Sequence, residues 1–294
     1  RMSVYLLIRT LNLKPSDEVI VAGYTCVVLT NAIKFTGCSI KYVDISRATL
    51  NLDTQSLIQS VSDRTKVLIV PHNFGIPYND IIEVKSKFPR IIIIEDVAHS
   101  FGATTDGKKM CGTIGDAGFF SLEYSKPLTA GMGGVMVINN KELLPNFRKE
   151  YEKLNEMKGA MVFKIIVTLG VYNLSYFKST TFFQTNSLRA LRLFKLQYGT
   201  SAKEIDGEIP DNYPVRMNAK LTCFLYQQLN TISKVNSIKQ EIVRSYNNAF
   251  KDWVDIKKFK TDNGVLVRYP IVFNENIEPQ IVQFIRDEGI RRGI

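Results

Sequence analysis

The chain has 294 residues, of which 45% are hydrophobic and 22% are charged, and its formal net charge is +10. These proportions exclude a disordered or fibrous chain and predict a real core, in one large domain or in one large and one smaller domain. The lysines and arginines are spread along the chain, and no zinc-finger, RNP or basic-zipper pattern accompanies them. We therefore expect no nucleic-acid partner, and we interpret the charge as suited to phosphorylated small molecules.

The cysteine pattern bears on the compartment and on metal binding. Cys26, Cys38, Cys111 and Cys223 include no CxxC pair and have no histidine at metal-ligand spacing. The pattern predicts neither a metal site nor a disulfide framework, and we expect reduced thiols in a cytoplasmic protein. No signal peptide is evident, but the chain opens on Arg1 rather than on methionine, which leaves a preceding segment open.

Short apolar runs alternate with helical patterns through the first half of the chain. Runs of four to six nearly continuous apolar residues are typical of parallel strands covered on both faces. The two clearest helical segments between them are TCVVLTNAIKF and NDIIEVKSKF. This alternation predicts an α/β fold with right-handed crossovers. The predicted strands are VIVA at 19–22, SIKYVD at 39–44, KVLIV at 66–70, IIIIED at 91–96, FFS at 119–121 and VMVI at 135–138.

Polar residues stand where three of these strands end. Ligands of open α/β sheets bind beyond the carboxyl ends of the strands. Asp96 and His99 follow IIII, Ser121 follows FF, and His72 with Asn73 follows KVLIV. We expect the functional site at this edge of the sheet.

Residues 158–200 break the α/β pattern with an apolar, aromatic and basic stretch. Lys164, Asn173 and Lys178 interrupt it too often for a membrane-spanning helix. Two interpretations stay open: an interfacial segment in peripheral contact with a membrane, or a helical hairpin packed on the protein or a partner subunit. We favour the hairpin, because basic amphipathic stretches are common without membranes.

The last part of the chain predicts the beginning of a second, smaller domain. Helical apolar spacing runs through Leu221, Phe224, Leu225 and Leu229, and a second helical stretch follows. VLVRYPIVF at 265–273 predicts a strand, and IVQFIRDEGI at 281–290 predicts a helix. We therefore expect an α+β unit at the carboxyl end.

Lys126 lies in the unusual stretch FSLEYSKPLTAGMGG, residues 120–134. A desolvated lysine is a nucleophile toward carbonyl compounds, and with pyridoxal phosphate it needs an acidic partner for the ring nitrogen and an anchor for the phosphate. Asp96 can supply the acid, and the Ser121 hydroxyl suits a phosphate. Taken singly these signals are weak, since an aspartate after a strand is about as often a helix cap, and the glycines suit a tight turn.

The order of motifs resembles the DegT/DnrJ/EryC1/StrS family, the sugar aminotransferases of pyridoxal-phosphate fold type I. The resemblance covers most of residues 1–140 and resumes at about 213. The motifs that carry it are DEVIVAGYTCVVLTNAI, VDISRATLNLD, HNFGIP, EDVAHSFGAT, GDAGFFSLEYSKPLTAGMGGVMV and YPVRMNAKL.

The resemblance implies a role for each matched position. It makes Lys126 the catalytic lysine that bonds pyridoxal 5'-phosphate and shuttles a proton, and Asp96 the catalytic partner of the pyridinium nitrogen. The remaining implied cofactor-binding residues are Ala98 on one ring face, His99 near the phenolic oxygen, Ser121 at the phosphate, Thr25 and Cys26 over the other ring face, and Arg1 beside the phosphate cup.

Several positions depart from the family pattern. Cys26 stands where the family often has an aromatic residue, and Pro214 stands where an asparagine commonly reaches the cofactor phosphate across a dimer. The family's Ser-Gly phosphate pair would precede Arg1, and its small domain continues beyond DEGIRRGI. These departures fit a partial sequence, a truncated variant or a degenerate paralogue. We favour a fragment of an active enzyme, because Asp96, His99, Ser121 and Lys126 are all present.

Together these expectations describe a three-layer α/β/α sandwich with a mostly parallel sheet plus a partial small α+β domain. The predicted large domain spans 1–238, with an insertion at about 158–205, and the small domain spans 239–294. The resemblance implies a cytoplasmic homodimer that transfers an amino group from glutamate or glutamine to a nucleotide-linked keto-sugar. The alternatives are a sugar dehydratase, in which histidine replaces the lysine, and a non-catalytic scaffold that kept the fold.

Overall fold

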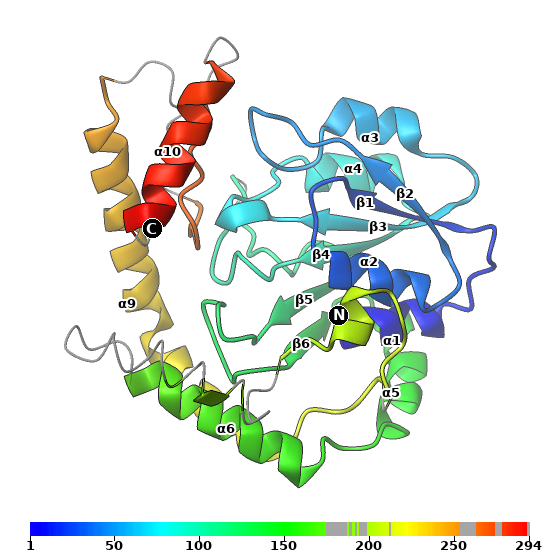
Figure 1. The fold of residues 1–294 in the computed structure, drawn as a ribbon. Helices are drawn as coiled ribbons and strands as arrows, with labels where there is room; N and C mark the ends of the chain where they lie inside the picture. The colour runs from blue at the N-terminus through cyan, green and yellow to red at the C-terminus, as the bar shows by residue number, and fades with distance from the viewer. Residues whose placement is uncertain are drawn as a thin grey trace.

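A computed structural model describes residues 1–106, 108–174, 199–211, 213–252, 263–273 and 278–292, together with residues 187, 190, 191 and 193. Six strands in this part of the chain form one sheet, in the order β2-β1-β3-β4-β5-β6 (Figure 1). The first five strands are parallel, and β6 is antiparallel to β5. Their bounds are β1 Glu18–Ala22, β2 Ser39–Val43, β3 Thr65–Pro71, β4 Ile92–Asp96, β5 Ala117–Ser121 and β6 Gly134–Ile138, which confirms all six predicted strands.

Helices cover both faces of the sheet. Alternate residues of a strand point to opposite faces, and in β1 Val19 and Val21 join one buried cluster while Ile20 and Ala22 join another. The first cluster includes residues of helices α1 (Met2–Thr10) and α2 (Val27–Lys34), and the second includes residues of α3 (Thr54–Ser60) and α4 (Ile81–Lys87). These layers confirm the predicted three-layer α/β/α sandwich.

The remaining helices follow the sheet in the chain. They are α5 Leu144–Glu152, α6 Gly159–Leu174, α8 Ala202–Ile205, α9 Ala219–Ala249 and α10 Pro279–Arg292, with short 3-10 turns η1 at Asn73–Gly75 and η2 at Lys141–Leu143. Side-chain caps fix several helix starts: Asp53 accepts from the Ser56 amide at the start of α3, and Asn218 accepts from the Lys220 amide at the start of α9.

A third buried cluster joins α6 and α9 to the loop between β5 and β6. Ile165 and Leu169 of α6 and Leu221 of α9 pack with Leu122 and Met132 of the loop. The other side of α6 is open, since Phe163 is 60% exposed. Residues 159–174 therefore pack on the protein body, while most of residues 175–198 lie outside the described part of the chain.

Two sequence predictions in the last third differ from the structure. The two helical stretches expected after residue 219 are one continuous helix, the 31-residue α9. The strand predicted at 265–273 is wrong: residues 265–272 are irregular coil, and Phe273 is a single bridge residue. Val265 and Leu266 are buried because the segment lies across the loop after β3, where the Val265 and Val267 amides donate to the carbonyls of Gly75 and Phe74, rather than by joining a sheet.

The expected domain boundary at 238/239 falls inside α9, and the division into two domains stays a prediction. In Figure 1, α9 and α10 lie together beside the sheet, on the side toward which the parallel strands point. Among the helices that the structure describes, none is long and apolar enough to cross a membrane.

Candidate active site

Lys126 lies on the loop that joins β5 to the antiparallel strand β6. Backbone bonds close this loop near its base, from the Leu122 amide to the Gly133 carbonyl at 3.1 Å and from the Ala130 amide to the Leu122 carbonyl at 3.0 Å. The loop requires a glycine at position 131. Gly131 has a φ of +81°, and a Cβ on it would lie 2.6 Å from the Ile165 side chain. The loop is therefore compact and closely packed.

Gln228 of α9 holds the same loop from outside. Its Oε1 accepts from the Thr129 amide at 2.9 Å, and its Nε2 donates to the Thr129 carbonyl at 2.7 Å. The amide side chain thus pairs with both backbone polar groups of Thr129 and ties the Lys126 loop to the long helix.

The Lys126 amine contacts His99, as Nζ lies 2.9 Å from His99 Nε2. His99 follows β4, and Lys126 follows β5, so the pair joins the carboxyl ends of neighbouring strands. A lysine ammonium can only donate, so Nε2 accepts its proton and the ring proton of a neutral His99 lies on Nδ1.

Both groups are shifted toward their neutral forms. Burial lowers the pKa of Lys126, partly opposed by the charge of Asp96, and Arg268 lowers it further. Burial, followed by the charges of Lys126 and Arg268, lowers the pKa of His99 to about 4. His99 is therefore a neutral acceptor near pH 7, and the lysine is a better nucleophile than an exposed one.

Asp96 closes β4 and lies within electrostatic reach of Lys126. Its Oδ1 accepts from the Ala98 amide at 2.9 Å, while Oδ2 has no hydrogen-bond donor among the described residues. Burial raises the pKa of Asp96, although the Ala98 amide and the Lys126 charge act in the opposite direction. One oxygen of this carboxylate is therefore available to a cationic N–H group.

Beneath Asp96, a fully buried pair fixes the ends of β3 and β4. His72 Nε2 donates to Glu95 Oε2 at 3.0 Å, and the Tyr78 amide donates to His72 Nδ1 at 3.0 Å. Glu95 also accepts from the amides of Gly112, Ile114 and Gly115, each at 2.7 Å. Burial raises the pKa of Glu95, but these hydrogen bonds outweigh it and the pKa is lowered overall.

A row of aromatic rings leads from His99 toward solvent. Phe74 lies 6.5 Å from the His99 ring, and Tyr24 stacks on Phe74 at 5.5 Å. Phe74 has a positive φ of 58°, which a bulky residue seldom adopts, and such strain collects at functional sites. Tyr24 is 53% exposed, so the row forms an open wall of the site.

The other expected cofactor residues are spread around this centre. Ser121 ends β5, and its hydroxyl accepts from the Glu123 amide at 3.5 Å. Cys26 stands at the N-cap position of α2 without a side-chain capping bond, is exposed and interacts electrostatically with Lys126, while Thr25 precedes it and is partly buried. The Arg1 guanidinium instead pairs with Glu204 at 3.0 Å and donates to Thr200 at 2.7 Å. The binding roles of Ser121, Cys26, Thr25, Ala98 and Arg1 stay predictions.

Sequence reasoning missed three contributors to the site. Phe74, Arg268 and Gln228 come from the loop after β3, from the coil at 263–273 and from α9. It also gave no role to Glu95, although a glutamate inside an apolar strand run is a signal that a buried partner is needed.

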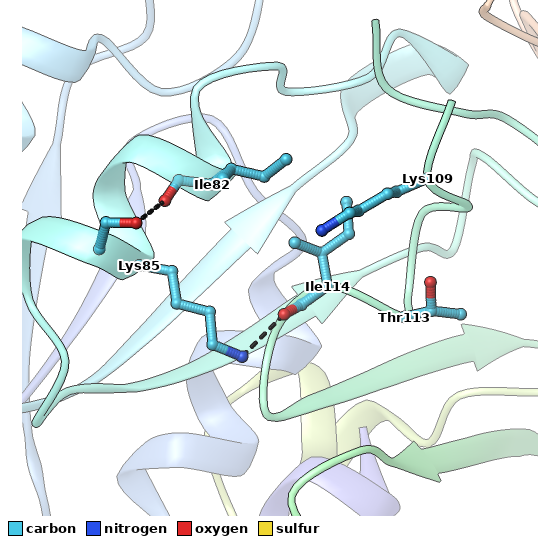
Figure 2. Close-up of a pocket in the computed structure, with 6 residues that line it drawn as sticks. Ile82, Lys85, Lys109, Thr113 and Ile114 are labelled. Atoms are coloured by element: carbon cyan, nitrogen blue, oxygen red, sulfur yellow. Dashed lines mark hydrogen bonds between the residues drawn. The ribbon is translucent and has the colours of Figure 1, made fainter. Parts of the chain in front are cut away.

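A separate hollow of about 350 Å³ lies at the opposite edge of the sheet, between α4 and the loop before β5 (Figure 2). Lys85 donates to the Ile114 carbonyl at 2.8 Å, and Lys109, Thr113, Ile82 and Ser86 complete the lining. Because it borders the amino end of β5 and Lys126 follows the carboxyl end, it does not belong to the Lys126 site.

Comparisons with known proteins agree with this geometry. The DegT/DnrJ/EryC1/StrS aminotransferase family matches residues 2–162. The chain is 34% identical to GDP-perosamine synthase of Escherichia coli O157:H7, over 48% of this chain and 39% of the relative. It is 36% identical to GDP-4-keto-6-deoxy-D-mannose 3-dehydratase of E. coli O55:H7, over 45% of this chain and 34% of the relative. These matches span less than half of the relatives' lengths.

Among solved structures, the fold is similar to an aminotransferase of Helicobacter pylori described as involved in pseudoaminic acid biosynthesis. The TM-score is 0.71 at 19% identity, and the match covers all of this chain and 68% of the other. At this identity the likeness shows the fold, which agrees with the sandwich described above.

Proposed function

Because the chain belongs to the DegT/DnrJ/EryC1/StrS aminotransferase family, we propose that it is a pyridoxal-phosphate-dependent sugar aminotransferase. The observation that carries this proposal is the Lys126 amine, whose pKa is lowered, 2.9 Å from His99 and within electrostatic reach of Asp96. All three residues lie within the matched part of the chain.

The donor set fits pyridoxal phosphate. The cofactor supplies an aldehyde for an amine and a ring that draws electrons from the substrate carbon. The free Oδ2 of Asp96 suits the protonated ring nitrogen, Lys126 Nζ suits the aldehyde, and the Ser121 hydroxyl with neighbouring amides suits the phosphate. Ala98, His99, Thr25, Cys26 and Arg1 would complete the setting, as the family resemblance implies.

In this arrangement Lys126 Nζ would take the proton from the substrate carbon that bears the amine and carry it on Nζ until it is returned, so the same group would act first as base and then as acid. The lowered pKa of Lys126 favours the neutral amine that can accept this proton. His99 stays neutral and holds Nζ by its Nε2, and so it orients the amine without competing for positive charge.

For the substrates, we propose that glutamate or glutamine gives the amine and that a nucleotide-linked keto-sugar accepts it. The product would serve amino-sugar synthesis for a cell-surface polysaccharide, in a cytoplasmic homodimer. The relatives support this class: GDP-perosamine synthase is an amino-sugar enzyme by name. One relative, GDP-4-keto-6-deoxy-D-mannose 3-dehydratase, supports the alternative hypothesis of a sugar dehydratase. However, Lys126 stands where the dehydratase branch carries histidine, which favours amino transfer.

The test is cofactor uptake followed by product analysis. The purified protein mixed with pyridoxal phosphate should show a visible absorption band, which Lys126→Ala should abolish. Lys109→Ala is the matched control, since Lys109 borders the separate hollow. Failure to take up the cofactor would refute the enzyme proposal and favour a scaffold.

The mass of the product distinguishes the aminotransferase hypothesis from the dehydratase hypothesis. With glutamate and nucleotide-linked 4-keto-sugars, we expect an amino-sugar product. A deoxygenated sugar without nitrogen would instead assign the chain to the dehydratases.

A further inference from the structure

The coil at 263–273 crosses the loop after β3 at the mouth of the Lys126 site. The Val265 amide donates to the Gly75 carbonyl at 3.0 Å, and the Val267 amide donates to the Phe74 carbonyl at 2.9 Å. The approach needs a glycine: Gly75 has a φ of +94°, and a Cβ there would lie 1.9 Å from the Val265 carbonyl oxygen. The residue after Val267 is therefore held next to the aromatic row.

Further contacts anchor the coil on both sides. The Asn263 carbonyl accepts from the Thr104 amide at 2.9 Å, and the Gly264 carbonyl accepts from Gln240 of α9 at 3.3 Å. The Tyr269 hydroxyl donates to Asn247 of α9 at 2.8 Å. These bonds bracket Arg268, so its backbone position is set by the sheet loop and by α9 together.

Arg268 brings a positive charge to a site that already holds a lysine. It is exposed, and no acidic side chain in the described part of the chain forms an ion pair with it. Its charge adds to the effect of burial in lowering the pKa of both His99 and Lys126, so Arg268 lies within electrostatic reach of both residues. A guanidinium that has no acidic partner among the described residues, near a lysine, favours the binding of an anion.

We propose that Arg268 is a substrate-binding residue that holds an anionic group, a carboxylate or a phosphate, beside Lys126. The guanidinium presents a planar fork of donors that fits either oxyanion in a bidentate manner. The Phe74 and Tyr24 rings form the adjoining wall, against which an apolar or planar part of the same substrate can lie. The identity of the substrate rests on the proposed function, but the contact between an anion and Arg268 does not.

Anion binding at Arg268 also changes the charge that Lys126 and His99 feel. A bound oxyanion offsets the guanidinium charge, which removes one of the causes that lower both pKa values. The site therefore gains basicity when its substrate is in place.

The first experiment needs neither cofactor nor turnover. The chain contains two histidines, so the ring signals of ¹⁵N-labelled protein are few, and His99→Gln identifies the His99 signal. Arg268→Gln should raise the pKa of His99 above its value of about 4. Arg90→Gln is the control, since Arg90 is exposed just before β4, at the far edge of the sheet, and removes the same charge. An unchanged His99 titration in Arg268→Gln, or an equal shift in Arg90→Gln, would overturn the placement.

The second experiment identifies the anion by calorimetric binding of L-glutamate and of GDP to the cofactor-loaded chain. Loss of a charge-assisted pair should weaken one of them roughly 10-fold to 100-fold in Arg268→Gln, with Arg90→Gln unchanged. Weaker glutamate binding assigns Arg268 to a carboxylate, and weaker GDP binding assigns it to a phosphate. Unchanged affinity for both overturns the proposal. If the chain takes up no pyridoxal phosphate, the His99 titration and GDP binding still decide the role of Arg268.

Discussion

The two histidines of this chain follow neighbouring parallel strands and have opposite surroundings. His72 is fully buried, and both of its ring nitrogens are satisfied, by Glu95 and by the Tyr78 amide. His99 is partly buried, contacts the Lys126 amine and faces the charge of Arg268. The first arrangement leaves no atom free for a ligand, whereas the second leaves a shifted titratable group at an open wall. Position after a strand therefore indicates the functional edge of the sheet. The hydrogen-bond partners of each histidine then distinguish a structural residue from a candidate functional one.

The comparison predicts the largest loss of stability at Glu95. Glu95→Ala removes the acceptor of one imidazole and three backbone amides, all buried. Breaking such a buried network costs roughly 3–5 kcal/mol in the free energy of unfolding. Urea unfolding measures it, with Glu152→Ala as an exposed control. Equal midpoints for the two variants would show that the buried pair is not structural.

The same substitution at each histidine should then separate their roles. His72→Phe keeps an aromatic ring but leaves the Tyr78 amide and part of Glu95 unsatisfied, which should cost about 2 kcal/mol. His99→Phe should cost less than about 1 kcal/mol, because it removes the hydrogen bond with Lys126 at the edge of the site and leaves no buried group unsatisfied. Unfolding measurements on the two variants give the difference directly, and the reverse order would invert the comparison.

His99 should also make the free energy of unfolding decrease as the pH falls, which is a smaller effect. The pKa of His99 is about 4 in the folded chain, below the ordinary value near 6.5, so the unfolded chain binds a proton first as the pH falls. The stability tied to neutral His99 is present above pH 6.5 and is lost toward pH 4, by at most about 1.4 kcal/mol per pH unit.

His99→Gln should therefore lose less stability than the wild type between pH 7 and pH 5. Urea unfolding at the two pH values checks this prediction. Parallel losses in both proteins would place His99 in water rather than beside Lys126.

The smallest expected effect is the influence of Lys126 on its neighbour. The Lys126 charge is the second cause, after burial, that lowers the pKa of His99. Lys126→Met should raise that pKa part of the way from about 4 toward 6.5, since burial persists. An NMR titration of the His99 ring measures it, and a further fall would contradict the hydrogen bond described above.

Local sequence patterns were sufficient for much of the fold and for the centre of the site. Continuous apolar runs predict β-strands because both faces of the sheet are buried, and Asp96, His99 and Lys126 could be grouped because parallel strands share a carboxyl edge. The strand expected at 265–273 is absent because Val265 and Leu266 are buried against a loop instead of a sheet, which no local pattern encodes. Local patterns also could not predict the roles of Gln228 and Arg268, because each residue acts on a segment far away in the sequence. Gln228, for example, lies 99 positions from Thr129.

The two bonds between Gln228 and Thr129 have a mechanical consequence. A surface loop normally moves independently of the elements around it, yet here the amide and the carbonyl of one residue, Thr129, are both bonded to a side chain of a 31-residue helix. Any sliding of the helix along its axis must strain both bonds at once. Lys126 therefore lies on a loop whose motion is restricted by its attachment to a long helix.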